Sequence, residues 1–271
     1  MSMKAFRGEI LHFIEDPALN SQKDIEQSSH QYFADGILLI ENGKVKQLGS
    51  AESLLAQLDG DIEITHIENG LIVPGFIDTH IHYPQTEMIG SYGEQLLQWL
   101  ENYTFPVEKQ FSDKSYALKI SEFFLNQLLT NGTTTALVFG SVHPESVEAF
   151  FETALDKNLR MIAGKVMMDI NAPDYLTDTA QSSYDESKAL IEKWHGKGRL
   201  QYAVTPRFAP TSSNEQLSFA GQLLKEHQGV YLHTHLSENL KEIEWVKSLH
   251  PDCENYLDVY NKHQLLSERS V

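Results

Sequence analysis

The chain has 271 residues, of which 41% are apolar and 10% aromatic, a composition that favours a folded globular protein with one large domain or two smaller ones. Its 38 acidic and 21 basic residues give a formal net charge of −17, which disfavours a nucleic acid or an anionic membrane surface as a partner. The single cysteine, Cys253, excludes an intrachain disulfide and a cysteine-rich zinc site, and without a long apolar run or a signal-peptide pattern we expect a soluble cytoplasmic protein.

The first seventy residues are predicted to form strands and turns. The expected elements are a strand, a hairpin, a short helix and a further strand, over residues 5–16, 36–49, 51–58 and 62–67. Within the hairpin, Asn42 and Gly43 supply the positive φ angles that a tight turn requires. Residues 1–70 are therefore expected to be the N-terminal part of a small β domain.

From residue 71 strands and helices alternate, which is typical of a parallel sheet with helical crossovers. The expected strands lie at 71–78, 133–140, 159–170, 200–208 and 230–238. Helices are expected over residues 112–132, 144–158, 183–196, 212–227 and 237–249. The first of these strands, LIVPGFID, is predicted to be buried, with Pro74 and Gly75 interrupting it.

A barrel explains this alternation better than an open dinucleotide-binding sheet. The first strand lacks the Gly-rich turn of the open sheet, whereas polar residues follow several strands, at the ends where a (β/α)8 barrel builds its site. Such a barrel has eight strands, and we count five, with 265–271 as the approach to a sixth. Residues 71–271 are therefore expected to supply the first five to six β/α units of a barrel that is incomplete in this chain.

His80 and His82 close the first barrel strand. Residues i and i+2 of a strand point to the same side, so both imidazoles can reach one metal ion, and Asp78 lies on the same face, where it can orient them. An isolated His-x-His pair is more often incidental than a ligand pair. The position of this pair after a predicted strand strengthens the metal hypothesis.

His233, His235 and Glu238 follow the fifth strand and can meet the first pair inside a barrel mouth. One of the two histidines suffices as a third ligand, and for His233 we favour a hydrogen-bonded interior position. Three protein ligands and a water describe a catalytic zinc site, with Glu238 as proton shuttle, although iron would suit the same ligands. Neither a Gly-x-Ser-x-Gly elbow nor the cysteine-ligated deaminase signature is present in the sequence.

Arg207 and Phe208 follow the fourth strand. An arginine at a barrel mouth can donate to a carbonyl oxygen, and an aromatic ring can cover a planar ligand. The alternative interpretation is a surface salt bridge for Arg207 and core packing for Phe208.

Three segments together resemble the amidohydrolase superfamily, and within it the guanine deaminases: PGFIDTHIHYPQTEMIGSYGEQLLQWLENYTFPVE, TPRFAPTSS and HTHLSEN. The resemblance extends through essentially the whole chain and implies a metal-dependent barrel of amidohydrolase type with a small flanking β-sandwich domain. It implies hydrolytic deamination of guanine to xanthine and ammonia, with one zinc ion per chain held by His80, His82 and His235. It further implies that Glu238 shuttles a proton to the purine.

For the substrate, the resemblance implies that guanine is held by Gln85, Arg207 and Phe208, with Arg207 directed at the carbonyl. A homodimer is compatible with it. A further His and a zinc-binding Asp of the family come from later barrel strands, and neither Asp252 nor Asp258 is placed to replace them.

We therefore expect this chain alone to be inactive, or nearly so, while the parent protein deaminates guanine. Two alternatives stay open. One is a related amidohydrolase acting on another heterocycle, such as a different purine or a pterin. The other is a non-catalytic binding protein that retains part of the barrel.

Overall fold

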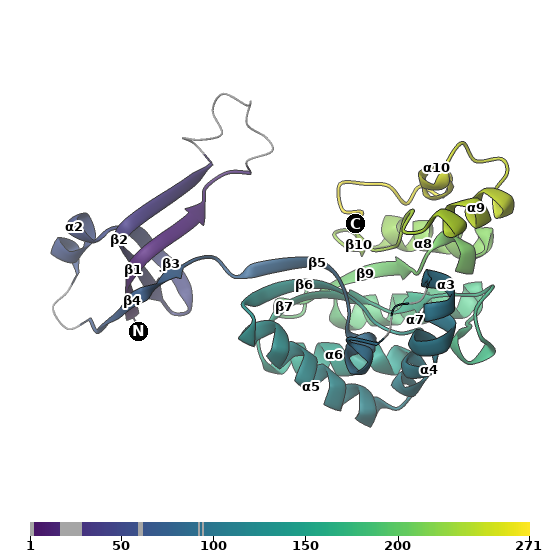
Figure 1. The fold of residues 1–271 in the computed structure, drawn as a ribbon, viewed down its shortest axis with the longest axis horizontal. Helices are drawn as coiled ribbons and strands as arrows, with labels where there is room; N and C mark the ends of the chain where they lie inside the picture. Colours follow the sequence, from purple (N-terminus) through teal and green to yellow (C-terminus); the bar gives the residue numbers. More distant parts are fainter. Residues whose placement is uncertain (1–2, 17–28, 59–61, 92, 94) are drawn as a thin grey trace. The chain divides into compact units, whose positions relative to one another are not determined.

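The computed structural model describes residues 3–16, 29–58, 62–91, 93 and 95–271. Contacts between Cα atoms divide the chain into two units, Met1–Gly75 and Phe76–Val271, and each unit has its own sheet (Figure 1). Among the described residues, no helix combines the length and apolar character needed to span a membrane.

The first unit is built on a four-stranded sheet in the order β3-β2-β1-β4. Its strands are β1 (Met3–Phe13), β2 (His30–Glu41), β3 (Lys44–Ser50) and β4 (Ile64–Ile72). β1 pairs antiparallel with β2 and parallel with β4. The β2–β3 hairpin turns at Asn42 and Gly43, whose φ angles are 52° and 78°, so the predicted tight turn is confirmed.

The predicted short helix of the first unit forms in two parts, α2 (Ala51–Leu54) and a 3-10 turn, η2 (Leu55–Gln57). Ser50 caps α2 by accepting a hydrogen bond from the backbone N–H of Ser53. The helix packs on the sheet, and the buried core of the unit comprises Ala5, Ile37, Leu39, Ala51 and Leu54.

The second unit contains a parallel sheet in the order β10-β9-β7-β6-β5, with β8 also paired to β9. The strands are β5 (Phe76–His82), β6 (Thr133–Phe139), β7 (Arg160–Gly164), β8 (Val166–Met167), β9 (Gln201–Pro206) and β10 (Tyr231–Leu232). Strands β5, β6, β7, β9 and β10 thus lie side by side in chain order, as expected for five neighbouring strands of a barrel. The segment expected as one strand over 159–170 forms two, β7 and β8.

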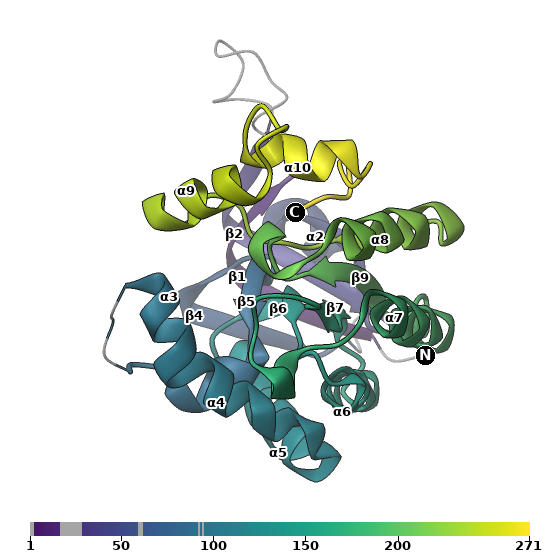
Figure 2. The same ribbon diagram turned by 90° about the vertical axis from the view of Figure 1, so that its right-hand side faces the viewer.

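Helices connect these strands and cover one face of the sheet (Figures 1 and 2). The longer ones are α5 (Lys114–Thr130), α6 (Pro144–Asp156), α7 (Ala180–Trp194), α8 (Asn214–Glu226), α9 (Leu240–Leu249) and α10 (Tyr256–Lys262). Shorter turns of helix are η3 (Tyr83–Met88), α3 (Leu96–Trp99), η4 (Leu100–Thr104), α4 (Phe105–Glu108), η5 (Lys109–Ser112), η6 (Asp174–Leu176) and η7 (Ala209–Thr211).

Side chains of the strands alternate between two faces of the sheet, as a period of two requires. Ala136 and Val138 of β6 join the large apolar cluster that the helices share. Leu137, between them, packs instead with Ile162 of β7 and Ala203 of β9 in a separate cluster. The wall therefore buries apolar residues on both faces, which explains the near-continuous apolar runs of its strands.

The predicted buried strand over 71–78 is wrong in two respects. Leu71 and Ile72 end β4 of the first unit, whereas Phe76 begins β5 of the second. Phe76 and Ile77 are 60% and 68% exposed because β5 is an edge strand, hydrogen-bonded in the described sheet to β6. Pro74, which has no N–H to donate, lies in the segment between the two strands.

At the other edge, residues 269–271 run parallel to β10. The backbone N–H of Leu232 donates to the carbonyl of Arg269 at 3.0 Å, and that of Val271 donates to the carbonyl of Leu232 at 3.1 Å. Ser270 thus forms one parallel bridge with Leu232, at the edge where 265–271 are expected to approach a sixth strand, and that strand stays a prediction.

Candidate functional site

Three strands bring the predicted site residues to one end of the sheet. His80 and His82 end β5, Arg207 follows β9, and His235 and Glu238 follow β10. Because parallel strands end at the same edge, residues far apart in sequence converge there.

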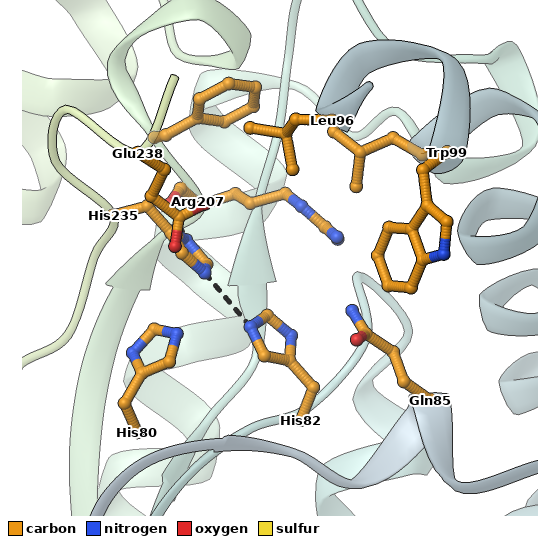
Figure 3. A pocket seen from close by; sticks show the side chains of 10 residues that line it. His80, His82, Gln85, Leu96, Trp99, Arg207, His235 and Glu238 are labelled. Carbon is orange, nitrogen blue, oxygen red and sulfur yellow. Dashed lines mark hydrogen bonds between the residues drawn. The ribbon is translucent and has the colours of Figure 1, made fainter. Parts of the chain in front are cut away.

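His80, His82 and His235 each offer a ring nitrogen, and these three atoms all lie within 4.8 Å of one another. The Nε2 atoms of His82 and His235 are 3.0 Å apart and face each other (Figure 3). Two nitrogens bound at about 2.0–2.1 Å to one tetrahedral zinc ion would be separated by about 3.3 Å. The observed spacing therefore fits a shared metal ion.

The backbone fixes which nitrogen of His235 is available. Its Nδ1 lies 2.7 Å from the carbonyl oxygen of Arg207, which can only accept, so Nδ1 carries the proton. Nε2 is then left with a free lone pair aimed at His82. Burial lowers the pKa of His235 to about 3, which keeps its ring neutral, the form that binds metals.

Phe139 at the end of β6 supports the ring of His82. The two rings are stacked with centroids 4.4 Å apart and planes 11° from parallel. Burial first, and then the neighbouring ionisable groups of His235 and Arg207, lower the pKa of His82 well below its usual value. Its Nδ1 is buried without a hydrogen-bond partner among the described residues.

His233 is fully buried, and its Nε2 lies 3.1 Å from Nδ1 of His80. This is the interior hydrogen-bonded position that the sequence favoured, and His233 does not join the group of three. Asp78 accepts a hydrogen bond from the backbone N–H of His80 at 3.0 Å, so it contacts the main chain of His80 rather than its ring.

The three histidines border a pocket that is also lined by Gln85, Leu96, Trp99, Leu100, Arg207, Phe208 and Glu238. In Figure 3 the guanidinium of Arg207, the indole of Trp99 and the amide of Gln85 approach the same space. The sequence identified the polar members of this wall. It did not assign a role to the apolar segment of α3 and η4, because apolar residues at helical spacing are usually core.

Arg207 and Phe208 both line the pocket, and their contacts with a planar ligand stay predictions. The surface salt bridge considered for Arg207 is wrong, because its side chain is buried. Arg207 lines the pocket and also forms a buried, two-pronged salt bridge with Glu108, at 2.7 Å and 3.1 Å. Phe208 is 5% exposed and packs in an apolar cluster that includes Phe105 and Phe139, yet it borders the pocket as well.

Glu108, the acidic partner of Arg207 in this salt bridge, was not predicted from the sequence to be a site residue. It is fully buried, and the signal for it was a carboxylate placed directly after the apolar residues Phe105, Pro106 and Val107. Gln85 Nε2 approaches the same carboxylate at 3.5 Å, the limit of a hydrogen bond.

Glu238 stands at the rim of the pocket. Ser237 before it adopts a left-handed conformation, with φ of 58°, which turns the chain back toward the site. The backbone N–H of Glu238 donates to Glu242 at 2.9 Å. Burial, then the charge of Glu242, raises the pKa of Glu238 despite Arg207, so its carboxyl is suited to take up and release a proton.

Asp252 and Asp258 do not line this pocket. Asp258 instead caps the turn before α10, accepting from the backbone N–H of Glu254 at 3.1 Å.

Comparison with known proteins identifies the family. The model of the amidohydrolase family matches residues 71–270. The chain belongs to the amidohydrolase family. The similarity to guanine deaminases extends beyond the motifs to the whole chain. The chain is 54% identical over 270 residues to the guanine deaminase of Escherichia coli, and the matched region covers 100% of this chain and 61% of that protein.

Solved structures agree with this family. The E. coli guanine deaminase has a TM-score of 0.93, with 98% of this chain and 61% of that chain covered. Guanine deaminase from C. acetobutylicum, solved with guanine bound in its active site, is 31% identical with a TM-score of 0.88, covering 99% of this chain and 61% of that chain. This amidohydrolase chain thus spans about three fifths of the length of these relatives, and its predicted α/β barrel architecture is confirmed over that part.

Proposed function

We propose that the whole protein is a zinc-dependent guanine deaminase that converts guanine and water to xanthine and ammonia. One observation carries the proposal: ring nitrogens of three histidines converge at a pocket that is also lined by a carboxyl, Glu238, and by the guanidinium of Arg207. The similarity to guanine deaminases supports guanine as the substrate.

His80, His82 and His235 are the proposed ligands of one zinc ion, although iron suits the same imidazoles. When bound, zinc supplies a Lewis acid that makes water reactive at neutral pH. The spacing of the three nitrogens and the tautomer of His235 fit such an ion.

Arg207, Gln85 and Phe208 are the proposed base-binding residues. Arg207 donates to the ring carbonyl of guanine, and Gln85 offers an amide to the polar edge. The rings of Phe208 and Trp99 cover the planar base and keep bulk water away.

Glu238 moves the protons. In the net reaction, the water oxygen bonds to C2 while the bond from C2 to the amino nitrogen breaks. One water proton goes to a ring nitrogen next to C2 and the other to the departing amino group. The raised pKa of Glu238 lets its carboxyl carry both in turn.

The test is guanine turnover by the whole zinc-loaded protein, followed by ammonia release and the change in purine absorbance. Glu238→Gln is expected to lower kcat by roughly 10² to 10⁴, the usual worth of a general acid–base residue. Glu244→Gln, an exposed glutamate of α9, is the matched control and is expected to leave kcat unchanged.

A substrate panel separates the alternatives. Faster turnover of a pterin or of another purine than of guanine would replace the substrate assignment. Bound zinc with no turnover of any heterocycle would favour a binding protein. The 271-residue chain by itself is expected to be inactive or nearly so, and guanine turnover by it at an ordinary enzymatic rate would contradict that expectation.

A further inference from the structure

We propose that Glu108 is a positioning residue: it directs the guanidinium of Arg207 at the carbonyl of a 6-oxopurine, orients the amide of Gln85 beside it, and thereby makes the pocket select oxopurines over purines without that oxygen. This inference rests on the proposed function and deepens it, since it names what sets the specificity of the same site.

The geometry of the ion pair fixes the direction of the guanidinium. Nη1 of Arg207 donates to Oε2 of Glu108 at 2.7 Å, and Nη2 donates to Oε1 at 3.1 Å. Two parallel hydrogen bonds hold the planar guanidinium in the plane of the carboxylate, which a single contact would not do. Of the five N–H groups of an arginine, these contacts use two, so the others remain for a ligand.

Burial makes Glu108 and Arg207 depend on each other for their hydrogen bonds and for charge balance. Glu108 is fully buried and Arg207 is 3% exposed, so water cannot substitute for either partner. The ring of Phe105 flanks the guanidinium at 5.5 Å from its centroid. Phe105 and Glu108 are the first and last residues of α4, so this short helix restrains Arg207 from two sides.

Glu108 also links the two polar residues of the wall. Its Oε1 receives Nη2 of Arg207 and lies 3.5 Å from Nε2 of Gln85. With its Nε2 held toward Glu108, the amide of Gln85 is oriented within the pocket that Arg207 lines. One carboxylate that touches no substrate therefore sets the direction of two groups that would.

The test measures binding rather than turnover. Hypoxanthine carries the carbonyl but lacks the amino group at C2, and purine lacks both, so neither is deaminated. Their dissociation constants are measured by calorimetry on the whole zinc-loaded protein. The ratio of the two dissociation constants, purine over hypoxanthine, measures the preference for the carbonyl, and it is expected to exceed one in the wild type. Glu108→Gln is expected to reduce this ratio by roughly tenfold or more, since the hydrogen bond from Arg207 to the carbonyl is misdirected.

Two further variants complete the design. Glu108→Asp keeps the charge on a side chain one methylene shorter and is expected to reduce the ratio less than Glu108→Gln. Glu101→Gln changes an exposed glutamate of the neighbouring turn η4 and is expected to keep the wild-type ratio. Zinc content and circular dichroism report whether each variant is folded.

The positioning role is overturned if folded Glu108→Gln keeps the wild-type ratio, if both dissociation constants rise in parallel, or if the wild type does not prefer hypoxanthine. If Glu108→Gln does not fold, Glu108→Asp decides in the same way. A reduced ratio in a protein that does not deaminate guanine would keep the positioning role and refute the deaminase. Guanine turnover with an unchanged ratio would do the reverse.

Discussion

Lys165, directly after β7, carries a buried charge whose removal should be costly. Its side chain is 0% exposed, and its ammonium contacts Asp178 at 2.5 Å and Glu186 at 3.2 Å. We expect Lys165→Met to lower the free energy of unfolding by about 4 kcal/mol at pH 7.

Two routes lead to this magnitude. Without the ammonium, Asp178 keeps hydrogen bonds from the Met168 N–H at 3.3 Å and from Gln216 at 3.0 Å. The positive charge that lay 2.5 Å from its carboxylate is lost. Breaking a buried ion pair from one side costs about 3–5 kcal/mol. If Asp178 takes up a proton instead, it does so at pH 7, about three units above its ordinary pKa. Each unit costs about 1.4 kcal/mol, so protonation also costs about 4 kcal/mol.

The same reasoning fixes the pH dependence. Burial raises the pKa of Asp178 in the folded protein even with Lys165 opposing it. Loss of the Lys165 ammonium is expected to raise this pKa further. A raised carboxyl pKa means that the folded state holds the proton more tightly, so this stability is present at low pH and lost as the pH rises through the folded pKa. The deficit of Lys165→Met should therefore shrink to about 1.5 kcal/mol at pH 5.

Urea denaturation of the whole protein at both pH values measures the effect. Lys188→Met is the control, because Lys188 is partly exposed and its pairing with Glu226, at 3.4 Å, is screened by water, so little change is expected. A loss below about 1 kcal/mol for Lys165→Met at pH 7, or an equal loss at both values, would refute the reasoning.

Three further changes test the site and its support. His82→Ala should abolish stoichiometric zinc binding in elemental analysis, whereas His66→Ala in the first unit should retain it; equal zinc in both would contradict the three-histidine site. Phe139→Ala removes the ring stacked on His82 and should lower stability by about 3–5 kcal/mol in urea denaturation, together with weaker zinc retention against a chelator. Gly164→Ala should prevent correct folding, since the added Cβ would lie 1.7 Å from the carbonyl oxygen of Ala203; normal soluble yield and zinc content would show that β7 can move away.

The ligand residues were predictable because their signal is local. His80 and His82 share a strand end, and His235 and Arg207 each follow an apolar run, so periodicity alone sends them to one edge of a parallel sheet. Glu108 was not predictable in this way. It meets Arg207 across 99 positions of sequence, and spacing along one chain carries no record of such a contact.

The error over 71–78 has a different origin. An apolar run predicts burial from composition, but whether its two halves pair in one sheet is decided by the partners available to each. Ile72 pairs with Ile10 of β1, whereas Phe76 pairs with Thr133 of β6, so neighbouring residues serve different sheets.

The contact between His235 and the main chain at position 207 bears on how new specificities could evolve. The oxygen that holds the His235 ring belongs to the peptide backbone, and every amino acid carries one. The side chain at 207 can therefore be exchanged in a library without removing the acceptor that orients the metal ligand. On the proposed function, substrate choice and metal retention are separable there, which makes position 207, varied together with 108, a natural starting point for redirecting the pocket to other heterocycles.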